Sequence, residues 1–182
     1  MQTEASIIKQ VRYWVLNTVV GLNFCPFARK PLEDEAINFC IVGSSKKKQV
    51  LEMLLQQCAL LQENTDLATS LLILDQGYAD FYDYLDILEV AQELMALEGY
   101  EGVFQLASFH PDYCFDGLDI DDAANFTNRS PYPILHLIRE QELEDLLEHY
   151  PNPEDIPLRN IDFARDKGVE VLQRLLEQAK AL

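Results

Sequence analysis

The sequence predicts a single α/β domain over residues 1–182, with a mixed, mostly parallel sheet of about four strands flanked by helices. Short apolar runs typical of strands alternate with longer segments of helical periodicity. No low-complexity stretch or linker divides the chain, and a hydrophobic fraction of 48% is enough for one full core. Strands that alternate with helices imply right-handed crossovers and therefore a largely parallel sheet.

The first half of the chain opens with a helix and then alternates strand and helix. Between residues 7 and 22 apolar side chains recur at three- and four-residue steps, which predicts a helix that ends near Gly21. A short strand is predicted at 36–42, and a helix begins after the Gly-Ser-Ser sequence at 43–45. The run SLLILD at 70–75 is typical of a strand buried on both faces.

The second half continues the alternation and then departs from it. A helix is predicted at 80–97, strands at 103–109 and 134–138, and helices at 140–149 and about 159–179. The strand at 134–138 has no helix before it, so an antiparallel orientation stays open for that strand.

The composition restricts the classes of function. The net charge is −17, and no Lys or Arg occurs from residue 49 to residue 128. Nucleic acids and anionic membrane surfaces both need a basic patch, so neither is expected as a partner. The sequence has no apolar run of the roughly 20 residues that span a bilayer and no pattern of a signal peptide. Its four cysteines lie far apart, which favours reduced thiols and a cytosolic location.

The segment 110–132 (HPDYCFDGLDIDDAANFTNRSPY) is a long loop between the third and fourth strands. Structureless segments longer than about 12–15 residues are usually functional or disordered, and the four aromatic residues of this one disfavour disorder. The loop begins at the carboxyl end of a strand, where open α/β sheets place their ligands. We therefore expect the functional site here.

The stretch NFCPFARK at 23–30 places Cys25 directly before Pro26. Proline suits the first position of a helix, so Cys25 would cap that helix, with Arg29 and the helix dipole lowering the pKa of the thiol. Locally the stretch is similar to the CPFA-x-R turn of omega-class glutathione transferases. Their thioredoxin fold needs a strand before the cysteine, whereas the pattern here is helical. The alternative is a buried thiol that packs as a small hydrophobe.

The stretch SFHPDYCFDG at 108–117 carries His110 and Asp112. An extended segment would point His110, Asp112, Cys114 and Asp116 the same way. Imidazole, thiolate and carboxylate together can bind a transition metal, and a carboxylate can also orient a histidine that acts as general acid or base. The spacing matches no zinc signature, so no metal site is predicted and the cofactor stays open. In the alternative interpretation, His110 and Asp112 hold the loop through hydrogen bonds to backbone groups.

The stretch from 125 to 139 carries Arg129, whose planar fork matches a carboxylate or phosphate. Asn125, Asn128 and Ser130 offer neutral donors beside it. His136 alternates with Leu135 and Leu137 and is expected on the opposite face of its strand. Alternatively, Arg129 pairs with an aspartate of the loop, and His136 is a satisfied sheet-face histidine.

Three blocks together resemble a family of bacterial proteins with relatives in plants that is catalogued as a domain of unknown function. They are GLNFCPFAR, FQLASFHPDYCFDG and DDAANFTNRSPYPILHLIRE. The resemblance covers nearly the whole chain and implies a free-standing small protein, without an activity or a catalytic residue to carry over.

The leading hypothesis is an enzyme or ligand-binding protein for a small anionic molecule. In it Cys25, His110, Arg129 and His136 line one cleft, because proline beside the first three holds each at the boundary of an element. A protein-interaction module that uses the aromatic and acidic loop 110–132 is the alternative, and a metal-dependent hydrolase is a third. The reaction and the oligomeric state stay open.

Overall fold

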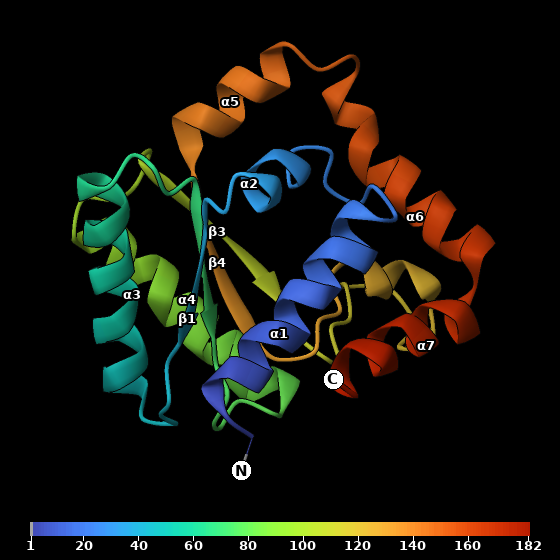
Figure 1. Ribbon diagram of the computed structural model, residues 1–182, viewed down its shortest axis with the longest axis horizontal. Coiled ribbons are helices and arrows are strands. Elements are labelled where there is room, and N and C mark those ends of the chain that lie inside the picture. Colours follow the sequence, from blue (N-terminus) through green and yellow to red (C-terminus); the bar gives the residue numbers. More distant parts are fainter. Residues whose placement is uncertain (1) are drawn as a thin grey trace.

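The part of the chain that the structure describes, residues 2–182, forms one four-stranded sheet with helices on both faces (Figure 1). The structure is a computed structural model. The strands are β1 (Ile37–Ile41), β2 (Thr69–Ile73), β3 (Phe104–Phe109) and β4 (Ile134–Arg139). Each lies within two residues of the predicted bounds, because short apolar runs between turn residues specify strands well.

The helices surround this sheet in the order that the sequence pattern predicts. They are α1 (Glu4–Trp14), α2 (Arg29–Glu33), α3 (Lys47–Glu63), α4 (Phe81–Leu97), α5 (Glu140–Glu148), α6 (Ile156–Lys167) and α7 (Val169–Lys180). A π-helical segment η1 (Val15–Val20) extends α1, and short 3₁₀ turns lie at η2 (Ala123–Thr127) and η3 (Pro153–Asp155). The helix expected to begin at Pro26 is the five-residue α2, which begins three residues later, at Arg29.

The strand order β1-β2-β4-β3 confirms the mixed α/β sheet but corrects the expectation that it is mostly parallel. Only β1 and β2 pair in parallel, whereas β4 runs antiparallel to both β2 and β3. The chain reaches β4 through a loop and not through a crossover helix. It therefore returns in the opposite direction and occupies the place between β2 and β3.

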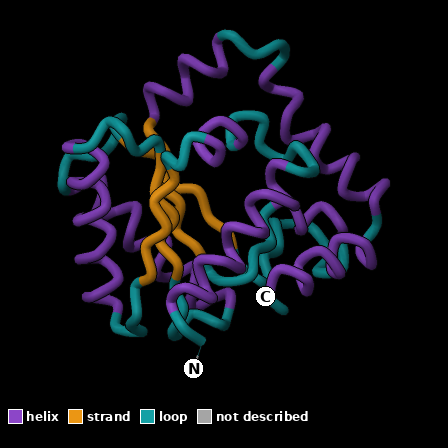
Figure 2. Tube along the Cα trace, viewed as in Figure 1, coloured by secondary structure: helices purple, strands orange, loops and turns teal. Residues whose placement is uncertain are grey.

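The two faces of the sheet build two separate cores. Figure 2 shows the strands at the centre with helices on both sides. On one face, Leu72, Leu135 and Leu137 pack with helices α3 and α4. On the other face, Leu71 and Ile134 pack with α1, η1, α6 and α7. Alternation of side chains along each strand is what separates the two sets.

The predicted helix at about 159–179 is interrupted, and this is a second correction. Gly168 has a φ of +83°, which lies outside the helical region, so α6 ends at Lys167 and α7 begins at Val169. The loop 110–132 is also more ordered than expected. It contains η2, whose Ala123 and Phe126 belong to the same buried cluster as Ala164 of α6 and Leu172 of α7.

Candidate functional site

A cavity of about 210 Å³ lies on the α1 face of the sheet, beneath helix α5. In the paired register, Leu71 of β2 and Ala107 of β3 stand on either side of His136 of β4. Because the methyl group of Ala107 is short, it leaves space above this part of the sheet. The sheet residues that line the cavity are Ile37, Thr69, Leu71, Ala107, Phe109, His136 and Ile138.

The side wall of the cavity comes from α1, η1, α2 and the turn before α2. Its residues are Trp14, Val15, Val19, Cys25, Phe27, Ala28 and Pro31. Helix α6 holds this turn from behind. Arg159 Nη2 donates to the carbonyl oxygen of Asn23 (3.1 Å), and Asn160 Nδ2 donates to that of Phe24 (2.6 Å). The position of Cys25 therefore depends on a helix more than 130 residues away in the sequence.

Helix α5 closes the remaining side with Glu142, Leu143 and Leu146. None of the nine residues of α5 is buried, so this helix rests on the cavity and not on a core of its own. Arg139, where β4 meets α5, donates from Nε to the carbonyl oxygen of Leu67 (3.2 Å) and from Nη2 to that of Asn64 (3.0 Å). These bonds fix the point at which α5 leaves the sheet.

His136 is a polar group on the floor of the cavity. Leu135 and Leu137 point to the α3–α4 face, so the prediction that His136 faces the opposite way is confirmed. Its Nε2 lies 2.7 Å from the hydroxyl oxygen of Thr69. Burial lowers the pKa of His136 from 6.5 to about 4, so the imidazole is neutral at neutral pH.

Cys25 lines the same cavity, but the expectation of an activated thiol at a helix start is wrong. Ala28, not Cys25, caps α2, and residues 25–28 form a turn in which the Ala28 N–H donates to the Cys25 carbonyl (3.3 Å). Arg29 pairs with Glu33 at the surface (3.7 Å). Burial raises the pKa of the Cys25 thiol, against a smaller opposing effect of the Phe27 and Ala28 N–H groups.

His110 is fully buried on the other side of the sheet, against the rings of Phe81 and Tyr84. The backbone N–H of Asp112 donates to His110 Nδ1 (3.0 Å), so Nε2 carries the proton and donates to the carbonyl oxygen of Tyr78 (3.0 Å). Both ring nitrogens thus bind backbone groups, as in the alternative interpretation of the sequence. The expected role of His110 as acid or base has no ring nitrogen left for a substrate.

Arg129 also binds the backbone of its own loop. Its Nε donates to the carbonyl oxygen of Tyr113 (3.1 Å), and its Nη2 donates to that of Ile120 (2.8 Å). The guanidinium lies over the ring of Phe126, 4.5 Å from its centroid. The fork that the sequence assigned to an anion is therefore used to close the loop.

The three neutral donors beside Arg129 are engaged in the same way. Asn128 Nδ2 donates to the carbonyl oxygen of Ser108 (3.0 Å), and the Ser130 hydroxyl donates to that of Tyr132. Asn125 is fully buried; its Oδ1 accepts from the Phe115 N–H (3.0 Å). Each side chain satisfies a backbone group that has no partner in the sheet.

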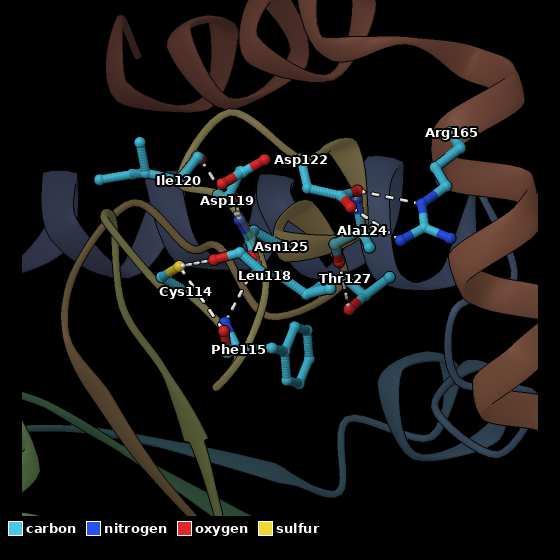
Figure 3. Close-up of polar contacts among 10 residues, drawn as sticks. All are labelled: Cys114, Phe115, Leu118, Asp119, Ile120, Asp122, Ala124, Asn125, Thr127 and Arg165. Carbon is cyan, nitrogen blue, oxygen red and sulfur yellow. Dashed lines mark hydrogen bonds and ion pairs between the residues drawn. The ribbon is translucent and has the colours of Figure 1, made fainter.

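Figure 3 shows the contacts of Asn125 and Asp122, which tie the loop to itself and to α6. Asn125 Nδ2 donates to the carbonyl oxygens of Asp119 (2.9 Å) and Ile120 (3.3 Å). Asp122 caps η2 by accepting from the Ala124 N–H (2.9 Å) and also binds Arg165 of α6 (2.7 Å). The loop is thereby held as a fixed part of the fold.

The expectation that Cys25, His110, Arg129 and His136 line one cleft is wrong. Cys25 and His136 line the cavity, whereas His110 and Arg129 do not. The physical reason is the strand period of two: Phe109 points to the cavity, so the next residue, His110, points to the α4 side. A proline lies near Cys25, His110 and Arg129 in the sequence, but this does not bring the three side chains together in the fold.

The residues that sequence reasoning missed are the apolar ones that shape the cavity. Leu143 and Leu146 lie in the helix predicted at 140–149, and Trp14 lies in the first predicted helix, but no role in a site is expected for any of them from the sequence. The sequence did contain one usable signal: Ala107 is a small residue on the same strand face as Phe109, at a strand centre where large side chains are usual. A gap in a strand face predicts a space above it.

Three further properties of the described residues concern metal-binding clusters, membrane-spanning helices and the cysteines. Across residues 2–182, no group of three or more His, Cys, Asp or Glu side chains is arranged to hold a metal ion. No helix within that range is long and apolar enough to cross a membrane. All four cysteines are free thiols.

Comparison of the sequence with models of known protein families gives a match. Residues 6–174 match the family model described as "Protein of unknown function (DUF1415)". The chain belongs to this family. The resemblance seen in the three sequence blocks is therefore confirmed, and the match includes every residue that lines the cavity. No curated protein and no solved structure shows significant similarity to the chain.

Arg129→Lys is expected to lower the free energy of unfolding by about 1–3 kcal/mol, because lysine cannot reach both carbonyl oxygens and leaves one of them unpaired. Urea unfolding measures this difference. Arg174→Lys, at an exposed position of α7, is the matched control and should stay within about 0.5 kcal/mol of the wild type. Equal stabilities of the two variants would contradict the structural role of Arg129.

The free energy of unfolding should decrease as the pH is lowered, and part of this decrease should come from the protonation of His136. Its folded pKa of about 4 lies below the ordinary 6.5, so the unfolded chain takes up a proton first and the lost stability appears between pH 6.5 and pH 4. From pH 7 to pH 4, the wild type should lose about 3 kcal/mol more than His136→Gln. Urea unfolding at a series of pH values measures both curves.

All other titratable groups are the same in both proteins, so the difference between the curves isolates His136. His149→Gln removes an exposed imidazole and serves as the control, which should retain the larger acid sensitivity of the wild type. Parallel curves for wild type and His136→Gln would show that His136 is not enclosed as described.

Proposed function

We propose that this protein binds a small, largely apolar molecule in the cavity beneath α5. The observation that carries the proposal is a cavity of about 210 Å³ with mostly apolar walls and one imidazole on its floor. Small-molecule sites are typically concave and apolar, with a few placed polar groups that orient the ligand. An engineered apolar cavity of about 150 Å³ is known to bind benzene, so this volume is sufficient for a molecule built on a ring.

Binding, not nucleophilic catalysis, is the activity that the chemistry of the cavity favours. The raised pKa of Cys25 keeps its thiol protonated near neutral pH, and a thiol is a much weaker nucleophile than a thiolate. The thiol can still contribute an S–H group to the cavity wall. A cytosolic location is part of the proposal, and the four free cysteines support it.

The ligand is proposed to be uncharged, and this departs from the anionic molecule expected from the sequence. Arg129 binds carbonyl oxygens of the loop and does not line the cavity. Arg139 does line it, but its guanidinium binds backbone carbonyls and pairs with Glu142 (3.3 Å). An anion in this space would be desolvated without a free cation to compensate for it.

The alternative of a docking loop receives less support. Its aromatic residues Tyr113, Phe115, Phe126 and Tyr132 are each buried or half-buried. A docking surface needs exposed apolar area, which these rings do not supply. The hydrolase alternative has no cluster of metal-binding side chains to support it within residues 2–182.

Ala107→Ile is expected to weaken binding strongly without unfolding the protein. The larger side chain extends from the cavity floor into the space that the ligand needs, and cavity filling generally preserves or raises stability. Thermal-shift screening of the wild type with neutral one- and two-ring compounds comes first. Binders are then measured against Ala107→Ile by calorimetry, with an expected loss of at least roughly tenfold, or about 1.4 kcal/mol.

Gln105→Ile is the matched control, because Gln105 lies on the same strand two residues away, is exposed and does not line the cavity. This variant should bind as the wild type does. If no neutral ring compound raises the melting temperature of the wild type, or if Ala107→Ile binds equally well, the proposal is wrong.

A further inference from the structure

The hydrogen bonds around His136 determine which nitrogen of its imidazole ring carries the proton. Its neighbours across the sheet, Leu71 and Ala107, are apolar, so neither competes for the imidazole. The polar group that reaches it is the hydroxyl of Thr69, whose oxygen lies 2.7 Å from His136 Nε2. The same hydroxyl oxygen lies 2.5 Å from the carbonyl oxygen of Leu137.

A hydroxyl group has one proton, and this settles both contacts. The carbonyl oxygen of Leu137 can only accept, so the Thr69 hydroxyl must donate its proton there. If that proton were directed to His136 instead, two oxygens would face each other at 2.5 Å with no proton between them. Thr69 therefore accepts from His136, and Nε2 of the neutral imidazole carries the hydrogen.

The other nitrogen, Nδ1, is left as a bare acceptor. Within residues 2–182 no group hydrogen-bonds to it, and yet no side-chain nitrogen or oxygen in that range is both buried and without a partner. Nδ1 must therefore retain accessible surface. The accessible space beside His136 is the cavity, whose floor the ring forms.

Resting on the proposed function, we infer that the molecule bound in the cavity is neutral and donates a hydrogen bond, through a hydroxyl or an N–H group, to Nδ1 of His136. An acceptor group at this place would meet the lone pair of Nδ1. A carboxylate or phosphate would do so with a full negative charge. A molecule without polar groups would leave Nδ1 unpaired in an apolar space, which costs free energy. The site therefore selects phenol-like, alcohol-like or indole-like compounds.

Matched pairs of compounds test this selection. Indole and benzofuran have nearly the same shape but differ in one N–H donor, and phenol and toluene form a smaller pair. Calorimetry should give roughly tenfold tighter binding for indole and phenol than for their partners, with no measurable binding of benzoate. Equal binding within both pairs overturns the inference while leaving the proposed function in place.

Two variants, Thr69→Val and His136→Leu, show whether the preference for donors comes from the tautomer of His136 or from the shape of the cavity. Valine has the shape of threonine but cannot accept from Nε2, so the imidazole proton is free to move to Nδ1. The preference for indole over benzofuran should then fall to within about twofold, and in His136→Leu it should disappear. A preference that survives both substitutions would show that another group recognises the donor.

The tautomer itself can be read without any bound compound. Long-range ¹H–¹⁵N spectra of histidine-labelled protein distinguish a protonated nitrogen from a bare one, and His136→Gln assigns the signals. The expected result is a proton on Nε2 and none on Nδ1. A proton on Nδ1 overturns the inference. If neither pair binds, the proposed function fails, and the spectrum decides separately whether the acceptor exists.

Discussion

Strand β4 is the constraint on which the rest of this structure depends, because it hydrogen-bonds to β2 and β3 at once. Without it, β3 has no neighbour in the sheet. Its alternation also divides the interior: Leu135 and Leu137 face α3 and α4, while Ile134 and His136 face the α1 side. The period of two that builds both cores thus places one imidazole on the floor of the cavity.

The insertion of β4 also explains why the loop before it is rich in polar residues of the types found in active sites. A chain that turns back between two strands without a crossover helix carries many backbone groups outside the ladder, and buried backbone groups must be paired. Asn125, His110 and Arg129 supply those partners. Side chains that resemble an active site in sequence are here the hydrogen-bond supports of an irregular segment.

The positions of the strands and most helices could be predicted, because hydrophobic periodicity is a local property of the chain. The strand order could not, because the place of β4 depends on which edge the returning chain meets. For the site, alternation along β4 predicted the face of His136, but its meeting with Cys25 depends on α6 holding a distant turn through Arg159 and Asn160. The pKa of Cys25 likewise follows from burial, a property of the assembled fold, and not from its basic neighbours.

The space above Ala107 and His136, beneath α5, is a largely apolar cavity of this protein. The walls of such a space lose dispersion contacts that a bound molecule restores. Crystallography under xenon pressure tests this most directly, since xenon enters apolar cavities and scatters strongly. We expect a xenon peak between Ala107, Leu71 and Leu143. A crystal structure in which α5 or the side wall fills that space, with no xenon bound, would contradict it.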